Sequence, residues 1–254
     1  MNENELLEIT SEIGYLMIKY GAEIFRVEDS IKRIISAYGT DKNIAVEVFA
    51  IPASLIVTIQ TDGGFPITQT KRISSRCTNL DRVDKLNSLS RNICRTKPDF
   101  ETVMKHIEEI KKRSEYGFKT IVISYAVVGF TFALFFGGGI KDAVIAGIIG
   151  ALIKLVSTLL EKIKPSIFLE SVVCSILAAS LAIISMRIGI TERFDKIIIG
   201  SLMTLVPGIT ITNCMRDFIA GDFLAGLYTM TEALIIAAGM AVGAATTISF
   251  LTGA

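Results

Sequence analysis

The fold is decided by residues 120–140, TIVISYAVVGFTFALFFGGGI, a stretch of 21 residues without a charged side chain between Lys119 and Lys141. An α-helix needs about 20 predominantly apolar residues to cross a hydrocarbon core of about 30 Å. The stretch meets that requirement. It therefore predicts a first membrane-spanning helix at about residues 120–140.

The chain after this stretch stays apolar, and four further runs each contain no more than one charged residue. The last run would be about 44 Å long as a single helix, so it has to tilt, break or protrude from the bilayer. It contains Gly239 and Gly243, a GxxxG pair that favours close packing against another helix. We expect a multi-pass α-helical membrane protein with about five transmembrane helices, at about residues 120–140, 143–160, 166–186, 197–215 and 223–251.

Charge divides the chain into two parts at about residue 117. Residues 1–117 contain 17 Lys+Arg and 17 Asp+Glu, whereas residues 118–254 contain 9 and 8. The first part is suited to water and the second to lipid, which predicts an N-terminal domain (1–117) and a transmembrane bundle (118–254). The overall balance of 26 basic to 25 acidic residues argues against nucleic acid as a partner.

The N-terminal part has the pattern of an α+β domain flanked by helices. Apolar residues recur at spacings of three and four over Leu6–Ile24 and again over Val27–Tyr38, which predicts two amphipathic helices. Two further helices are expected, one that begins near Asn79 and one that begins after Pro98. Between these pairs lie three short β-branched runs, which predict an antiparallel meander at 45–51, 54–60 and 66–74.

Basic residues next to the first span predict the orientation. Lys111, Lys112, Arg113 and Lys119 precede it directly, and such residues favour the cytosolic side. We therefore expect a protein of the cell (inner) membrane with its N-terminal domain in the cytosol. With five spans, its C-terminus would lie on the outer side of that membrane. The acidic start, MNENELLEIT, does not have the basic region of a signal peptide.

Familiar enzyme and metal-binding motifs are not found in the sequence. It contains no P-loop, GxGxxG, GxSxG or HExxH motif, so we expect no catalytic residue and no cofactor. The spacing of the cysteines and the single histidine matches no zinc site, so no metal is expected either; these residues are Cys77, Cys94, Cys174, Cys214 and His106.

Two ionisable residues lie deep in the predicted spans, Lys154 and Glu232. A charge at membrane depth costs roughly 2.5–3.5 kcal/mol, so such residues usually face protein or a water-filled path. Glu232 is a candidate carboxylate for proton or substrate coupling, and Lys154 is a candidate counter-charge or anion contact. The alternative is a structural pair, or a glutamate that stays protonated near the interface.

The fourth expected span contains a candidate break at Pro207-Gly208. Proline removes a backbone donor, and transporters use broken helices with freed backbone groups to bind polar substrates near the midplane. Thr210, Thr212 and Asn213 would supply hydroxyls and an amide there. An ordinary proline kink is the alternative. The adjacent Arg216 and Asp217 are expected to pair with one another at the cytosolic mouth.

Three blocks of sequence together resemble a known family, the threonine/serine exporters in their short, ThrE/YjjP-type form. The blocks are GAEIFRVEDS (21–30), KRISSR (71–76) leading into NLDRV (79–83) and NSLSR (87–91), and PGITITN (207–213) with the later Arg216-Asp217 and Glu232. The family's motif residues that stand here are Gly21, Glu23, Arg26, Glu28, Asp29, Arg76, Asn87, Arg91, Pro207, Gly208, Thr212, Asn213, Arg216, Asp217 and Glu232.

The resemblance implies a cytosolic domain followed by a membrane bundle that exports small polar metabolites such as threonine and serine, driven by the proton gradient. It also implies a second small multi-pass membrane subunit, because the long family members carry a second membrane region; a homo-oligomer is a further expectation. Paired proteins of the split form have been linked to export of a dicarboxylate, succinate, which is the alternative substrate. We expect residues 207–213 to shape the site, Glu232 to titrate, and the N-terminal motif to couple the domain to the bundle.

A function of another class is also compatible with the residues. The N-terminal domain could be an enzyme or sensor that the bundle merely anchors, with Arg26, Glu28 and Asp29 in acid–base roles.

Overall fold

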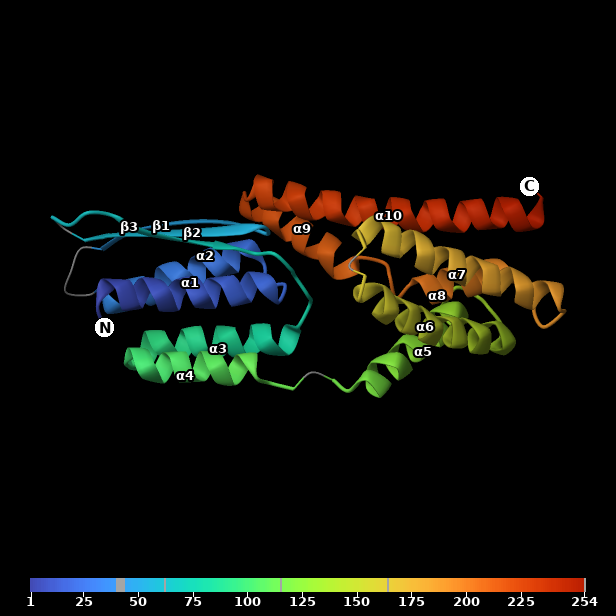
Figure 1. Ribbon diagram of the computed structural model, residues 1–254, viewed down its shortest axis with the longest axis horizontal. Helices are drawn as coiled ribbons and strands as arrows, with labels where there is room; N and C mark the ends of the chain where they lie inside the picture. The colour runs from blue at the N-terminus through green and yellow to red at the C-terminus, as the bar shows by residue number, and fades with distance from the viewer. Residues whose placement is uncertain (40–43, 62, 115, 164, 254) are drawn as a thin grey trace. The chain divides into compact units, whose positions relative to one another are not determined.

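The computed structural model describes residues 1–39, 44–61, 63–114, 116–163 and 165–253 (Figure 1). The chain divides into two compact units. The first consists of Met1–Ser114 and Ile211–Met230, and the second of Glu115–Thr210 and Thr231–Ala254. A segment far along the sequence is thus part of the same unit as the N-terminal domain.

The first unit has the order of elements that the sequence predicts. Helices α1 (Glu3–Lys19) and α2 (Ile24–Tyr38) come first, and helices α3 (Leu80–Thr96) and α4 (Phe100–Lys111) follow the strands. The strands β1 (Ile44–Ile51), β2 (Ser54–Thr61) and β3 (Ile67–Arg72) form an antiparallel sheet in the order β1-β2-β3. The prediction of an ααβββαα order is confirmed.

The core of this unit lies on both sides of α1 and α2. Figure 1 shows the sheet on one side of these helices and α3 and α4 on the other. The apolar stripe of α1 and the inner face of β2 are buried, as Ile13, Met17, Leu55 and Val57 show. The layers are also joined by charge, because Glu12 of α1 pairs with Lys71 at 2.6 Å and with Lys111 at 2.8 Å.

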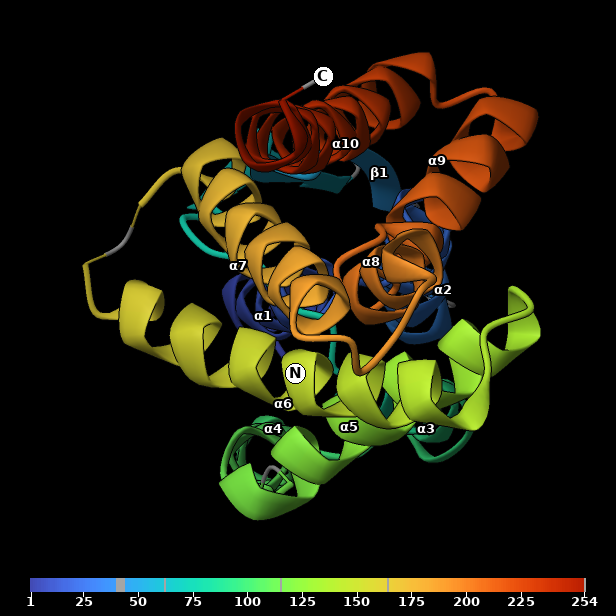
Figure 2. The ribbon, with the colours of Figure 1, turned by 90° about the vertical axis from the view of Figure 1, so that its right-hand side faces the viewer.

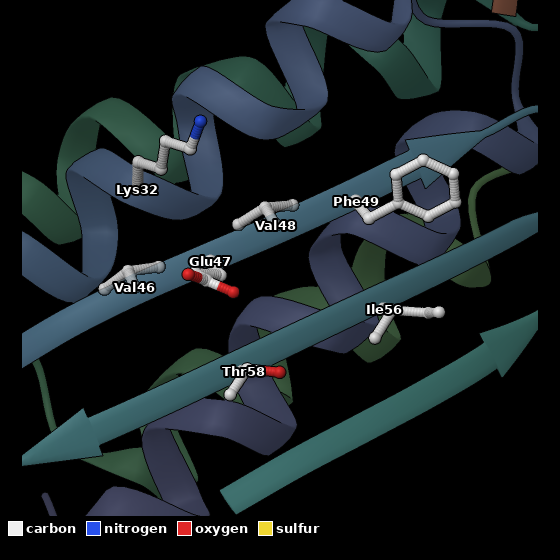
Figure 3. Close-up of a pocket in the computed structure, with 7 residues that line it drawn as sticks. All are labelled: Lys32, Val46, Glu47, Val48, Phe49, Ile56 and Thr58. Atoms are coloured by element: carbon white, nitrogen blue, oxygen red, sulfur yellow. The ribbon is translucent and has the colours of Figure 1, made fainter. Parts of the chain in front are cut away.

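A hollow of about 360 Å³ lies beside β1 and is lined by residues of α2, β1 and β2. Figure 3 shows Lys32 on α2, Glu47 and Phe49 on β1, and Ile56 on β2. None of the residues that the sequence singled out for function lines this hollow. Lys32 pairs with Glu28 at 3.7 Å, however, so the hollow lies next to one of the predicted site residues.

The second unit contains the membrane helices. Its elements are α5 (Phe118–Phe135), α6 (Ile140–Glu161), α7 (Ile167–Arg187) and α8 (Phe194–Leu202), which Figure 2 shows grouped together. Helices α9 (Gly208–Ala220) and α10 (Phe223–Thr252) contribute residues to both units. Among the described residues, four helices are long and apolar enough to cross a membrane, α5, α6, α7 and α10.

Glycines allow the membrane helices to approach closely. A Cβ atom on Gly129 or Gly150 would lie 2.5 Å from a backbone oxygen of the facing helix, so α5 and α6 cross almost backbone to backbone. The GxxxG pair also packs closely against another helix of the same chain, as predicted. Cβ atoms on Gly239 and Gly243 would lie 2.8 Å and 2.5 Å from backbone oxygens of α7.

The expected fourth span at 197–215 differs from the structure. Two shorter helices replace it, because α8 ends at Leu202 and α9 begins at Gly208. The physical reason is Pro207, which cannot donate a backbone hydrogen bond and disfavours helical geometry in the residue before it. The break that the sequence suggested is therefore present, and the region does not form a continuous spanning helix.

Candidate functional site

The candidate site lies at the N-terminus of α2 and is built entirely from the first unit. The chain turns there at Gly21, whose φ of +89° is in the left-handed region that favours glycine. Asn213 of α9 donates through Nδ2 to the Gly21 carbonyl oxygen at 3.4 Å. The first and last of the three sequence blocks thus meet at this turn.

A buried carboxylate joins α2 to α9. Glu23 is only 8% exposed and forms ion pairs with Arg26 on its own helix and with Arg216 on α9. Glu23 and Arg216 are 193 residues apart in the chain. The expected pairing of Arg216 with the adjacent Asp217 is therefore wrong; Arg216 pairs with Glu23 instead.

Asp217 accepts a hydrogen bond from the N-terminus of α2. Glu23, the residue at the cap position, makes no side-chain hydrogen bond to the first turn of α2. The backbone N–H of Ile24 instead donates to the carboxylate of Asp217. An acidic side chain is favourable there because a helix N-terminus carries partial positive charge. We refer to Glu23, Arg26, Arg216 and Asp217 as the α2 cluster.

The surroundings of Asp217 make it a proton acceptor near neutral pH. The residue is 2% exposed, and its Oδ1 has no hydrogen-bond partner within the described part of the chain. Burial raises the pKa of Asp217 to about 6, and the carboxylates of Asp222 and Glu23 add to the rise, against the lowering effect of the Ile24 N–H and of Arg76. This carboxyl can therefore gain or lose a proton in the physiological range.

An Asp217→Asn variant should change how stability depends on pH. The folded pKa of about 6 lies above the ordinary value of 3.8, so the stabilisation from this proton is full below the ordinary value and is lost as pH rises through about 6. Asparagine keeps an oxygen for the Ile24 N–H but carries no charge. We expect the variant to melt above the wild type at about pH 7.5 and at the same temperature at about pH 3, where the carboxyl is protonated in both the folded and the unfolded chain.

Thermal unfolding of the full chain, followed by ellipticity at several pH values, measures this difference. A wild type and a variant whose melting temperatures change in parallel with pH would show that Asp217 does not titrate in this range.

Glu28 is a second carboxylate with a raised pKa, on the next turn of α2. Burial is the largest cause of the rise, and Asp222 adds to it, whereas the Ala50 N–H and Lys32 oppose it. The Ala50 N–H donates to Glu28 Oε1 at 3.2 Å, so this side chain faces β1. Asp29 points elsewhere and pairs with Arg33 at 2.7 Å on the exposed side of α2.

The other predicted site residues lie in different places. Arg76 interacts electrostatically with Asp217. Asn87 and Arg91 are on α3, where Arg91 donates to Ser88 Oγ at 3.1 Å, and no hydrogen bond or ion pair among the described residues ties them to the α2 cluster. Thr212 is on α9 within the first unit, whereas Pro207, Gly208 and Thr210 belong to the second unit.

The two predicted membrane charges lie in the second unit. Lys154 pairs with Glu161 of its own helix at 3.3 Å and lies 5.9 Å from the centre of the Tyr125 ring. Glu232 is half-buried on α10. Sequence reasoning missed the neighbour of Lys154 on α5, Tyr125, although the short connection between α5 and α6 could have indicated it.

Comparison with known proteins decides the family. A family model described as "Putative threonine/serine exporter" (ThrE) matches residues 8–251, which is nearly the whole chain. The chain belongs to this family. The resemblance inferred from the three sequence blocks is confirmed, and with it a multi-pass membrane protein of an amino-acid exporter family.

Two curated relatives carry the same description. The chain is 22% identical to "Threonine/serine exporter" of Corynebacterium glutamicum over 243 aligned residues. The aligned region makes up 94% of this chain and 50% of the relative. The chain is 22% identical over 246 residues to "Probable threonine/serine exporter" of Mycobacterium tuberculosis (strain ATCC 25618 / H37Rv), covering 96% of this chain and 46% of the relative. The chain thus spans about half the length of these relatives. No solved structure matches it significantly.

Residues that are distant in the sequence meet in the α2 cluster. Glu23 and Arg26 come from the first sequence block and Arg216 and Asp217 from the last, yet all four lie in the first unit.

Proposed function

We propose that the chain exports small hydroxylated amino acids, threonine and serine, as part of a secondary transporter. The observation that carries the proposal is the match of nearly the whole chain to the threonine/serine exporter family. The four candidate membrane helices and the break between α8 and α9 support it, since broken helices are common in transporter binding sites. Export of succinate is the alternative.

A second membrane subunit completes the transporter in this proposal. The support is length, because the curated relatives are about twice as long as the region that this chain matches. The subunit we expect is a small multi-pass protein, and a homo-oligomer of the present chain is the other possible arrangement.

The first unit lies on the cytosolic side of the plasma (inner) membrane in this proposal. Lys111, Lys112, Arg113 and Lys119 flank the start of α5 and favour that side. The α2 cluster then belongs to the cytosolic part of the transporter. An even number of spans, such as the four candidates α5, α6, α7 and α10, would leave the C-terminus on the cytosolic side as well, whereas the outside position expected from the sequence requires a fifth crossing.

Proton uptake at Asp217 couples export to the proton gradient in this proposal. Its raised pKa of about 6 and its buried, unpartnered Oδ1 support the assignment. Protonation removes one negative charge beside Glu23 and Asp222, and thereby changes how strongly α9 is held at the N-terminus of α2. Glu232 is the second candidate for a coupling carboxylate, now in the membrane unit.

The function can be tested in cells that lack their own threonine exporters. Cells that produce the chain and its proposed second subunit are fed a threonine-containing dipeptide, which raises intracellular threonine. We expect extracellular threonine to rise faster than in cells with an empty vector. Equal rates for threonine and serine in the two cultures would contradict the proposal.

Variants Asp217→Asn and Glu232→Gln separate the two coupling candidates. The variant that removes the coupling proton should export threonine at a rate that no longer changes with the pH on either side of the membrane, because its carboxyl can no longer titrate. We expect this for Asp217→Asn, and we expect a reduced pH response for Glu232→Gln if both carboxyls take part. A wild-type pH response in either variant removes that residue from the coupling mechanism.

A further inference from the structure

Polar side chains from three membrane helices meet inside the second unit. They are Tyr125 of α5, Lys154 and Ser157 of α6, and Glu170 of α7, which we call the membrane cluster. Tyr125 follows the start of α5 by seven residues and Lys154 precedes the end of α6 by seven. At 1.5 Å per residue both lie about 10 Å inside the same end of the antiparallel helix pair.

Direct contacts hold these residues together. Ser157, which is 7% exposed, donates through Oγ to Glu170 Oε1 at 2.5 Å and so joins α6 to α7. The ammonium group of Lys154 lies 5.9 Å from the centre of the Tyr125 ring and so joins α6 to α5. Lys154 and Ser157 are three residues apart, which places them on one face of the helix.

The cluster is costly to keep in a membrane helix bundle. An ammonium group at membrane depth disfavours insertion by roughly 2.5–3.5 kcal/mol, and such residues usually mark a path for substrate or ions. Glu170 lies in the first turn of α7, nearer the end of its helix. Only 15% of the Lys154 side chain is exposed. The crossing of α5 and α6 beside it is fixed by Gly150, which holds the two backbones at a defined separation.

The chemistry of these groups matches one class of solute. A lysine ammonium can pair with a carboxylate, a glutamate carboxylate can accept from an ammonium group, and two hydroxyls can bind a hydroxyl. An α-amino acid with a hydroxylated side chain carries all three groups. The net charge also distinguishes the two candidate substrates. Lys154, Glu161 and Glu170 together carry one negative charge, which repels a dicarboxylate but not a zwitterion without net charge.

We propose that the membrane cluster binds a zwitterionic hydroxy amino acid, with Lys154 at the carboxylate of the solute and Glu170 at its ammonium group. Lys154 would exchange its bond to Glu161 for the solute. The inference rests on the proposed exporter function and deepens it, because it selects threonine or serine over succinate as the substrate class.

Binding of labelled threonine to the purified full chain in lipid nanodiscs tests the site. The competitors are threonine methyl ester, which has no carboxylate, 3-hydroxybutyrate, which has no ammonium group, and succinate. The wild type should bind threonine at least about tenfold more tightly than any competitor. The Lys154→Met variant should lose its preference over the ester, and Glu170→Gln its preference over 3-hydroxybutyrate, each with at least about tenfold weaker threonine binding.

The matched control is Lys162→Met, which removes an exposed lysine just beyond α6 and should bind threonine as the wild type does. Melting temperatures of all variants show that each is folded. Unchanged threonine affinity in Lys154→Met and Glu170→Gln would overturn the inference, and so would a folded wild type that binds no threonine or prefers succinate.

The outcomes for this site and for the proposed function are separable. Export of threonine by cells combined with unaffected binding in both variants leaves the function in place and overturns the site. The predicted competitor pattern without threonine export by the cells supports the site and contradicts the function.

Discussion

An Arg216→Ala variant is expected to lose about 2 kcal/mol of stability in the first unit. The reason is Glu23, a carboxylate that is 8% exposed and, among the residues that the structure describes, would keep Arg26 as its one ion-pair partner. Removing one member of a buried pair costs about 3–5 kcal/mol, but the Arg216 side chain is 53% exposed, which reduces the effect. Chemical unfolding of the full chain measures it, and threonine export should slow at least about tenfold.

The matched control is Arg33→Ala. Arg33 also forms an ion pair on the first unit, with Asp29, but both side chains are more than half exposed, at 72% and 55%. Exposed pairs contribute about 0–1 kcal/mol, so this variant should unfold almost as the wild type does. Similar losses of unfolding free energy in the two variants would show that the burial of Glu23 does not increase the stabilisation by its ion pair.

A double-mutant cycle isolates the pair itself. Glu23→Gln and Arg216→Gln should each destabilise the unit, whereas the double variant should lose less than the sum of the two, because neither charge is then left without its partner. Additive losses would contradict a direct interaction between the two side chains.

The second large effect is expected from Gly150→Val in the membrane unit. A Cβ atom at this position would lie 2.5 Å from the Tyr125 carbonyl oxygen, which belongs to the backbone and cannot rotate away. Helices α5 and α6 must therefore separate. We expect a loss of about 3 kcal/mol or more and, since the membrane cluster spans the same crossing, loss of threonine binding.

The control for added volume on α6 is Val144→Ile. Val144 is 47% exposed, so one more methylene group there meets no facing helix and should leave the melting temperature unchanged. A Gly150→Val protein that melts and binds threonine like the wild type would contradict the close crossing of α5 and α6.

Much of the fold follows from periodicity and from the length of apolar runs. The stripe that includes Ile13 and Met17 predicted α1, and the uncharged stretch at 120–140 predicted α5, because both patterns reflect which face of an element leaves water. Pro207 indicated the break between α8 and α9. Whether it would interrupt the helix or only kink it depended on tertiary contacts that no local pattern contains.

The pairing within the α2 cluster could not be predicted. Arg216 and Asp217 are neighbours on α9, and adjacent helix residues point about 100° apart, so they do not face one another. One reaches Glu23 and the other reaches the Ile24 N–H, contacts that depend on how distant segments pack. The resemblance to the family predicted a role for these residues but contained no information on whether they meet.

The most direct measurement of the central claim is efflux of labelled threonine from proteoliposomes that contain the chain and its proposed second subunit. We expect an inwardly directed proton gradient to accelerate the efflux of threonine but not the efflux of labelled succinate, and we expect Asp217→Asn to abolish this acceleration. Threonine and serine efflux at the rate of protein-free liposomes under the same gradient would contradict the central claim.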